Sequence, residues 1–243
     1  MSVLKFLIPG VLSLGNYLSL IRTFKKKSEK GFYPVNMKYF FDLISKNEVK
    51  FIQIGANDGQ LNDPIYPYIK GGKWKGILVE PLPPLFAKLK ITYSGIDGLV
   101  FENVGITEKD GEMDFYFLPA EYNEPDWLQQ IGTFDKKAIE LNLAHIPEFL
   151  PKVDKTTVST LSLSTLFKKN NIKSTDIFII DAEGFEYKIL KQLGQLDVKP
   201  KYIFFEWGCL EKEEYDKLIE SLEKQDYMLY QSGGDLLAIK NKI

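Results

Sequence analysis

The feature that most constrains the fold is a series of short apolar runs that alternate with helix-like segments. Clear examples are VKFIQI at 49–54, DIFIID at 176–181 and KYIFFE at 201–206. A strand with one wet face alternates apolar and polar residues, whereas a near-continuous apolar run is typical of a strand covered on both sides. Helical segments between such strands join parallel neighbours. The sequence therefore predicts an α/β protein with a mostly parallel sheet and helices on both faces.

The same pattern predicts the other elements of a domain over residues 38–243. The remaining expected strands are GILVE (76–80), GLVFEN (98–103), MDFYFL (113–118), TTVST (156–160), YMLYQ (227–231) and DLLAIK (235–240). The expected helices span 37–47, 82–90, 162–171, 184–193 and 211–225. The glycines of SGGD between the last two strands suit a tight turn, so we expect an antiparallel C-terminal hairpin.

One internal segment does not follow the strand and helix pattern. Residues 119–155 contain four prolines and several large aromatic residues. Long insertions at the rim of an α/β sheet usually serve as lids or substrate-binding elements. We therefore expect residues 119–155 to form an inserted loop and helix region beside the ligand.

The N-terminal segment, residues 1–37, also stands apart. An apolar stretch with helical spacing at 3–21 is followed by the basic sequence RTFKKKSEK, and Lys5, Pro9 and Asn16 interrupt the apolar run, which argues against a membrane-spanning helix. Three interpretations stay open: a helix docked on the domain or on a second copy of the chain, an anchor at an anionic membrane surface, and a cleaved signal peptide. We expect a cytoplasmic protein, with peripheral membrane contact through residues 1–30 and homo-oligomerisation as open alternatives.

Composition limits the available chemistry. Cys209 and His145 are the only cysteine and histidine, which excludes an intramolecular disulfide and a structural zinc site built from these two residue types. The 31 Lys+Arg and 33 Asp+Glu give a net charge of -2, so we expect no nucleic-acid partner that needs broad phosphate neutralisation. Acid–base chemistry must therefore use carboxylates, Lys, Tyr or His145.

The first candidate binding motif is FIQIGANDGQ, residues 51–60. A buried strand leads into Gly55, and Gly59 allows a tight turn against a bound molecule. Asn57 takes the place of the second glycine of a dinucleotide fingerprint, and Asp58 adds a negative charge that a pyrophosphate site avoids. The motif therefore favours a ligand with a cationic group.

Two further strand ends extend this motif. Glu80 ends the strand at 76–80, about 20 residues beyond the glycine loop, where a carboxylate can accept hydrogen bonds from both ribose hydroxyls. Asn103 ends the next strand and is a candidate contact for adenine or for the neighbouring loop. Taken singly, Glu80 before Pro81 is also typical of a turn, so it is the combination that predicts a nucleotide-type site.

The second motif is FIIDAEGFEYKIL, residues 178–190. Asp181 and Glu183 lie two apart at a strand end, so in extended backbone their carboxylates share a side, and Gly184 lets the chain enter the next helix. Like charges this close raise a pKa unless a cation, ligand or metal compensates them. Alternatively, Glu183 and Glu186 are acids favoured at a helix start by the helix dipole.

Together these blocks resemble a known family. FIQIGANDGQ, ILVEPLPPLFAKL, VFENVGI followed by GEMDFYF, VSTLSLSTLF and IIDAEGFEYKIL, in this order over about 48–210, resemble the FkbM family of S-adenosylmethionine-dependent methyltransferases. The resemblance implies a Rossmann-like class I methyltransferase fold with a seven-stranded sheet. It also implies that Asp181 closes the active-site end of the fourth strand. The implied cofactor contacts are Gly55, Ala56, Asn57, Asp58 and Gly59 around the methionine part, Glu80 at the ribose, Asn103 near the adenine, and Pro81 and Asp181.

The resemblance further implies methylation of a hydroxyl group, often on sugars or polyketide-like products. We expect a sugar, glycan or glycolipid acceptor, because the basic N-terminal segment would bring the enzyme to a membrane that carries such acceptors. An alcohol with a pKa of about 15 needs a base or a metal as the new bond forms. The candidate bases are His145, Asp181 and Glu183, and Asp181 with Glu183 are the candidate ligands of a divalent metal. Alternatives are a methyltransferase for a small-molecule natural product, a nicotinamide-dependent enzyme, and a binding protein that keeps the cofactor fold without activity.

Overall fold

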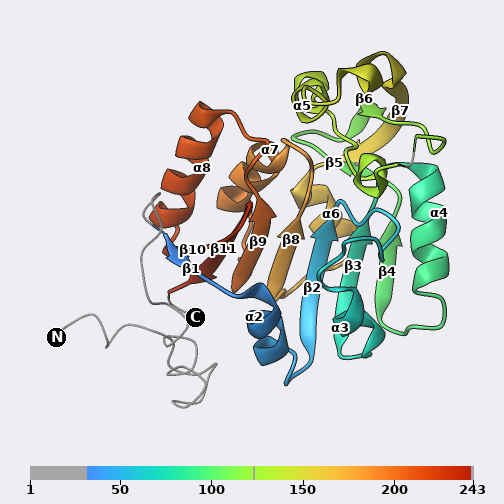
Figure 1. Ribbon diagram of the computed structural model, residues 1–243. Helices are drawn as coiled ribbons and strands as arrows, with labels where there is room; N and C mark the ends of the chain where they lie inside the picture. Colours follow the sequence, from blue (N-terminus) through green and yellow to red (C-terminus); the bar gives the residue numbers. More distant parts are fainter. Residues whose placement is uncertain (1–31, 123, 242–243) are drawn as a thin grey trace.

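A computed structural model describes residues 32–122 and 124–241 (Figure 1). Its centre is an eight-stranded sheet with the order β1-β10-β11-β9-β8-β2-β3-β4. The parallel strands are β2 (Val49–Ile54), β3 (Trp74–Val79), β4 (Leu99–Glu102), β8 (Ile177–Ile180) and β9 (Tyr202–Glu206). The prediction of a mostly parallel α/β sheet is confirmed.

The C-terminal hairpin is also confirmed. β10 (Tyr227–Ser232) and β11 (Asp235–Lys240) pair antiparallel, and β11 pairs antiparallel with β9. These strands complete the seven of the class I methyltransferase arrangement. The sheet has one strand more than expected, because the two-residue β1 (Tyr33–Pro34) adds to β10 in parallel. The rest of the N-terminal segment, residues 1–31, lies outside the described residues, and so do the interpretations given for it.

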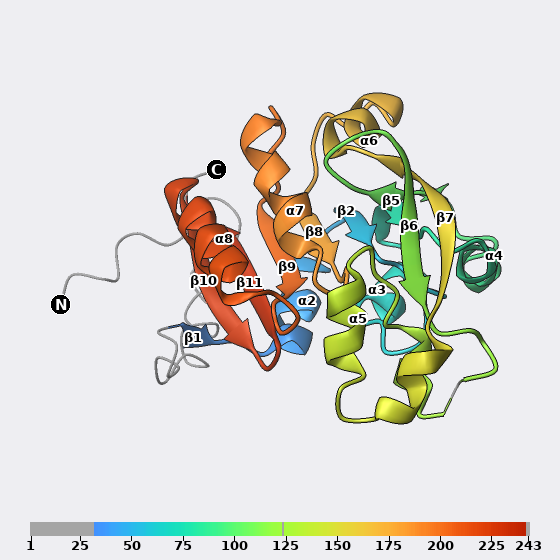
Figure 2. The same cartoon turned by 90° about the horizontal axis from the view of Figure 1, so that it is seen from above.

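Helices cover both faces of the sheet (Figure 2). On one face, α6 (Leu163–Lys169), α7 (Glu186–Leu190) and α8 (Lys212–Lys224) share a core with Ile52 and Ile54. On the other, α2 (Met37–Ile44), α3 (Tyr66–Lys70) and α4 (Pro83–Thr92) share a core with Phe51. Successive residues of β2 thus point into opposite cores, which explains its continuous apolar sequence. The helix expected at 184–193 continues from α7 as a 3-10 helix, η3 (Lys191–Gln195).

A second, three-stranded sheet has the order β5-β7-β6. Its strands are β5 (Gly105–Ile106), β6 (Gly111–Phe117) and β7 (Asp154–Leu161), so two strands expected from the sequence lie outside the main sheet. The insertion expected at 119–155 corresponds to the segment between β6 and β7, residues 118–122 and 124–153, which we call the cap. It contains η1 (Asp126–Gln129), α5 (Lys136–Asn142) and η2 (Pro147–Lys152).

The cap has a small hydrophobic core of its own, made by Leu118, Leu128, Ile131, Ile139 and Leu143. Figure 1 shows α5 and the second sheet beyond the carboxyl ends of the parallel strands. The cap therefore sits at the edge where ligands of parallel α/β sheets bind. Among residues 32–122 and 124–241, the helices are all too short or too polar to cross a bilayer.

Candidate active site

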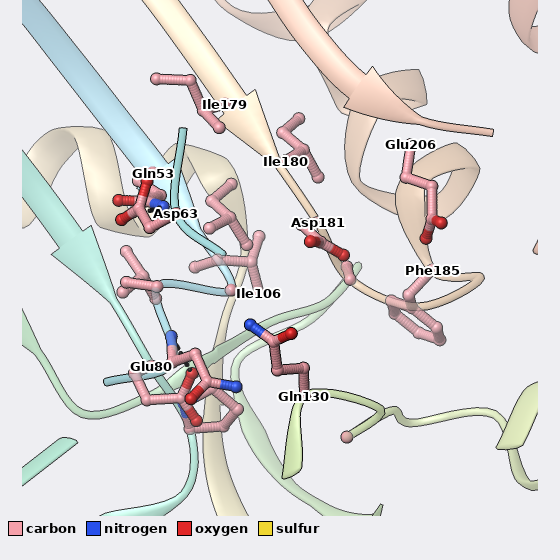
Figure 3. A pocket seen from close by; sticks show the side chains of 18 of the residues that line it. Gln53, Asp63, Glu80, Ile106, Gln130, Ile179, Ile180, Asp181, Phe185 and Glu206 are labelled. Carbon is pink, nitrogen blue, oxygen red and sulfur yellow. Dashed lines mark hydrogen bonds between the residues drawn. The ribbon is translucent and has the colours of Figure 1, made fainter. Parts of the chain in front are cut away.

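A cavity of about 300 Å³ opens at the carboxyl ends of the parallel strands (Figure 3). It lies where the strand order reverses between β2 and β8, which is the usual position of a ligand crevice in such sheets. The polar residues that line it include Gln53, Asn57, Glu80, Gln130, Asp181 and Glu206. Main-sheet strand ends and the cap thus contribute to one site.

The loop after β2 forms one wall of the cavity. Gly55 has a φ of 81°, and a Cβ built there would lie 1.8 Å from the backbone oxygen of Asp181, so the two strand ends approach too closely for a side chain. Gly55, Ala56 and Asn57, which the family resemblance implies as cofactor contacts, line the cavity. Their predicted contacts with a cofactor stay a prediction.

Asp58 and Gly59 lie behind this wall instead of lining the cavity. The Oδ1 of Asp58 accepts the backbone N–H groups of Gln60 and Leu61, both at 2.9 Å. The hydroxyl of Tyr93 donates to the backbone oxygen of Gly59 at 2.8 Å. Their structural part is therefore to hold the shape of the turn.

Glu80 joins the second strand end to the first. Its side chain is buried, and its carboxylate accepts the backbone N–H of Asn57 at 2.9 Å and that of Leu82 at 2.8 Å. Burial raises the pKa of Glu80 to about 7, and these two hydrogen bonds act in the opposite direction. Glu80 and Pro81 line the cavity. Asn103 does not; its amide donates to the backbone oxygens of Glu80 at 2.8 Å and Pro81 at 3.0 Å and so supports this loop.

Asp181 follows β8, and its side chain is exposed into the cavity. The protein around it displaces bulk water on its other sides. This loss of surrounding water and the negative charges of Glu206, Asp235 and Asp63 raise the pKa of Asp181 to about 7. Such a carboxyl group can hold or release a proton near neutral pH.

Glu183 does not join Asp181 in the cavity, contrary to the expectation that the two carboxylates share a side. Its backbone is left-handed, with a φ of 49°, so the extended geometry assumed for the strand end does not continue. Its Oε2 accepts the side-chain amide of Asn142 in α5 at 2.7 Å. Burial and the charge of Asp181 raise its pKa well above the usual range.

Glu186 has a structural part that exceeds that of a helix-start acid. Its fully buried carboxylate accepts the backbone N–H of Ala182 at 2.7 Å and of Gly184 at 3.0 Å. Burial raises its pKa to about 8. Glu186 therefore clamps the loop that carries Asp181.

His145 and Cys209 both lie off the cavity wall. The His145 ring is exposed and stacks on Trp127, with ring centroids 5.7 Å apart and an interplanar angle of 20°. The thiol of Cys209 donates to the Oδ1 of Asn142 at 3.2 Å, and burial raises its pKa. A neutral thiol is not a nucleophile, so Cys209 does not support thiolate chemistry.

Sequence analysis missed several residues of the cavity: Gln53, Asp63, Gln130, Glu206 and Asp235. Glu206 ends an apolar strand as Glu80 follows one, so the signal was present. The Gln53 amide donates to Asp63 at 3.2 Å, while its Oε1, on a side chain 5% exposed, has no hydrogen-bond partner among the described residues. Burial raises the pKa of Asp63 to about 6.

The cap is tied to the loop after β2 by three hydrogen bonds. Asn57 Nδ2 donates to the backbone oxygen of Gln129 at 3.3 Å, and Asn62 Nδ2 donates to Gln130 Oε1 at 2.9 Å. Gln130 Nε2 donates to the backbone oxygen of Leu61 at 2.7 Å. The loop and the cap therefore share one hydrogen-bonded wall.

The two residues predicted as metal ligands, Asp181 and Glu183, belong to two different groups of possible ligand atoms. Oxygens of Asp181, Glu186 and Glu206 lie within 4.8 Å of one another, and a second group joins Glu183, Glu206 and Cys209. Glu206 belongs to both groups, whereas Glu186 already binds two backbone N–H groups. Metal binding stays a prediction.

The charge of the cavity is one-sided. The carboxyl groups of Asp63, Glu80, Asp181, Glu206 and Asp235 line it. Over the described part of the chain, its lining includes no Lys, Arg or His. Buried carboxylates favour a ligand that brings positive charge and hydrogen-bond donors.

Comparisons with known proteins bear on this site. A family model described as the methyltransferase FkbM domain matches residues 53–229. No curated protein matches the chain. Among solved structures, the methyltransferase FkbM from Methylobacillus flagellatus KT is 13% identical, with a TM-score of 0.47, over 79% of this chain and 43% of that one. The chain therefore spans less than half the length of that protein.

Two fibrillarin structures are also similar to this chain. The Methanococcus jannaschii fibrillarin pre-rRNA processing protein is 12% identical, with a TM-score of 0.42, over 82% of this chain and 69% of that one. Aeropyrum pernix fibrillarin in complex with natively bound S-adenosyl-L-methionine is 9% identical, with a TM-score of 0.42, over 80% of this chain and 68% of that one.

Proposed function

Because the chain belongs to the methyltransferase FkbM domain family, we propose that it is an S-adenosylmethionine-dependent methyltransferase that acts on a hydroxyl group. The observation that carries the proposal is the carboxylate-lined cavity at the carboxyl ends of the parallel strands. When bound, the cofactor supplies a methyl group on a positively charged sulfur. A cavity lined by carboxylates and no basic side chain, over the described residues, suits that charge.

The residues of the cavity fit such a cofactor. The backbone at Gly55 leaves room for close approach, and Glu80 retains acceptor capacity for ribose hydroxyls because each of its oxygens accepts one backbone N–H. The Oε1 of Gln53, which has no hydrogen-bond partner among the described residues and lies with Asp63 beside it, suits the ammonium group of the methionine part. The cavity volume of about 300 Å³ lies at the lower end of the range for small-molecule sites.

Asp181 is the proposed proton acceptor. It lines the cavity, whereas His145 and Glu183 do not, and burial and its acidic neighbours raise its pKa to about 7. A general base works best when its pKa lies near the working pH. The Asp181 carboxylate would take the proton of the acceptor hydroxyl, and bound S-adenosylmethionine would supply the methyl group to that oxygen.

The proposed acceptor is a sugar, glycan or glycolipid. Gln130, Gly132 and Phe134 of the cap line the cavity, so an acceptor enters between the cap and the ends of the strands. A small-molecule natural product is the alternative acceptor, and a binding protein without activity is the alternative from another class.

Calorimetry with S-adenosylmethionine and with NAD tests the cofactor. We expect saturable binding of the former alone, and the reverse result would overturn the proposal. A screen of methyl transfer from tritiated cofactor then compares saccharides, lipid-linked glycans and small phenols. Cofactor binding without transfer to any of them would favour the non-catalytic alternative.

Residues 1–30 are proposed to bring the enzyme to an anionic membrane, because an apolar stretch precedes a basic cluster there. These residues lie outside the part of the chain that the structure describes. Flotation with anionic vesicles should be strong for the full chain and weak for a variant lacking residues 1–30. Equal flotation of the two proteins would contradict membrane binding by this segment.

A further inference from the structure

One wall of the cavity carries carboxylates on three neighbouring strands. Asp181 directly follows β8, Glu206 is the last residue of β9, and Asp235 is the first residue of β11. Ile180 pairs with Phe205, and Glu206 pairs with Asp235, so the three acids follow one another across the sheet. All three line the cavity, and Figure 3 shows Asp181 and Glu206 on adjacent strand ends. We call these three residues the acidic wall.

No described Lys, Arg or His lines this wall; a hydrogen bond from the Cys209 thiol lowers the pKa of Glu206 but brings no positive charge. The ionisable groups that face Glu206 from neighbouring elements are acidic or neutral: Asp181, Glu183 and Glu186 on the loop and helix after β8, Cys209 after β9, and Asp235 on β11. Burial and the charge of Glu206 raise the pKa of Asp235 to about 6, and burial raises that of Glu206. A bound cation would favour the charged forms of these carboxyl groups and so lower their pKa values.

A second, independent observation in the same cavity points to a ligand rich in hydrogen-bond donors. Gln53 lines the cavity with a side chain that is 5% exposed, and its Oε1 has no partner among the described residues. On the acidic wall itself, the Oε2 of Glu206 is shielded from solvent and likewise has no partner among them. Buried acceptors left without donors are costly, so both atoms favour a ligand that donates.

The two observations belong to different ends of the cavity. The Gln53 end lies with Glu80 and the glycine loop, where the cofactor is proposed to bind. The acidic wall extends beyond it to β9 and β11, where Glu206 and Asp235 line the cavity with no basic side chain among the described lining residues. A second molecule that carries positive charge would compensate them.

We propose that the acidic wall is the acceptor subsite, and that it binds hydroxyl compounds carrying a protonated amine, such as amino sugars, in preference to neutral ones and excludes anionic ones. This inference rests on the proposed function and names the acceptor class. An ammonium group donates three hydrogen bonds and carries the charge that the wall lacks. A carboxylate or phosphate on the acceptor would instead face like charges directly.

Three hexoses that differ in charge test the subsite: D-glucosamine, N-acetyl-D-glucosamine and D-glucuronate. Their binding is measured by ligand-observed NMR and calorimetry on protein saturated with S-adenosylhomocysteine. We expect glucosamine to bind at least about tenfold more tightly than N-acetylglucosamine, as one attractive ion pair near a protein surface allows. Glucuronate should not bind measurably at the same millimolar concentration.

Variants connect the charge order to the acidic wall. Glu206→Gln and Asp235→Asn should each lower the affinity for glucosamine about tenfold. The differences in affinity among the three hexoses should become smaller or disappear. Glu211→Gln is the matched control, because Glu211 is an exposed acid just beyond β9 that does not line the cavity. It should retain the affinity for glucosamine.

The divalent-cation arm uses magnesium chloride alone. Magnesium binding that depends on Glu206, together with no binding of glucosamine, would show that a metal ion supplies the counter-charge and would overturn the proposal. Affinities independent of hexose charge, or no binding of any of the three, would overturn it as well. The hexoses are also tested on the free protein, so that a failure to bind S-adenosylhomocysteine, which would count against the proposed function, is read separately.

Discussion

The carboxylate of Glu80 accepts a 2.9 Å hydrogen bond from the backbone N–H of Asn57, so the acid that follows β3 holds the loop that follows β2. Its other oxygen accepts the N–H of Leu82 at 2.8 Å. One side chain thereby positions two backbone segments of the cavity, which makes Glu80 a structural part of the site before any ligand binds.

Glu80→Gln should therefore weaken cofactor binding and stability together. A glutamine has one acceptor oxygen, so either Asn57 or Leu82 loses its partner, at a cost of about 1–3 kcal/mol. We expect S-adenosylmethionine affinity to fall about tenfold or more, measured by calorimetry. Glu102→Gln is the control: Glu102 is a buried acid that bonds Lys169 and Asn170 outside the cavity, so it should lose stability and keep cofactor affinity. Unchanged cofactor affinity in Glu80→Gln would contradict this structural role of Glu80.

Gly55→Ala should abolish cofactor binding, because the added Cβ meets the backbone oxygen of Asp181. Gly95→Ala separates this clash from backbone strain. Gly95 has a similar φ of 77°, against 81° at Gly55, and a Cβ there has no neighbour within 4 Å. We expect Gly95→Ala to cost about 1–3 kcal/mol and to bind S-adenosylmethionine normally. Similar losses of stability and binding in the two variants would show that the close approach is unimportant.

Gln130→Ala should loosen the cap. It removes the hydrogen bonds to Asn62 and to the backbone of Leu61, whereas Gln129→Ala leaves the bond from Asn57 in place because Gln129 contributes its backbone oxygen. We expect faster hydrogen exchange in the cap, residues 118–122 and 124–153, and weaker cofactor binding in the first variant only. Equal exchange in the two variants would mean that Gln130 does not couple the cap to the loop.

Asp63 should make stability depend on pH. Burial raises its pKa from 3.8 to about 6, so the folded protein holds this proton more strongly than the unfolded chain does. The stability contribution is complete below the unfolded pKa of 3.8 and is lost as the pH rises through about 6. Asp63→Asn should make the fall in thermal stability over this window less steep; Asp235, whose pKa is also raised to about 6, keeps part of the slope, and the exposed Asp97→Asn should leave it unchanged. A wild-type slope retained in Asp63→Asn would contradict the assignment.

Asp181→Asn should lower methyl transfer about 10²–10⁴-fold, the usual contribution of a general base, and leave cofactor affinity near that of the wild type. His145→Ala should retain most of the activity, since His145 is exposed and outside the cavity lining. The measurement is tritium transfer to the acceptor found by the screen. Loss of turnover in His145→Ala with activity retained in Asp181→Asn would show that His145, and not Asp181, is the general base.

Much of the main sheet could be predicted because burial on both faces leaves a strong local pattern. VKFIQI at 49–54 coincides with β2, since Phe51 points into one core and Ile52 into the other. The second sheet could not be separated from the first, because a strand's partners depend on distant parts of the chain. The two-residue β1 is too short to produce any periodic pattern.

The site divides in the same way. Gly55, Glu80 and Asp181 could be located because each follows an apolar strand, and parallel strands bring their carboxyl ends together. The orientation of Glu183 could not be predicted, because a left-handed backbone is uncommon at a residue other than glycine. Gln130 could not be found either, because it reaches the cavity through contacts with Leu61 and Asn62 that no local pattern encodes.

The cap has a hydrophobic core of its own, and Phe134 is its buried contact with the core of the main sheet. Leu118, Leu128 and Ile139 are buried against one another and not within the two cores of the main sheet. Exchanging cap sequences while keeping Phe134 and the hydrogen bonds at Gln129 and Gln130 should therefore yield chimaeras that still fold. In such chimaeras the pocket for the methyl donor would stay constant while the range of accepted substrates changes.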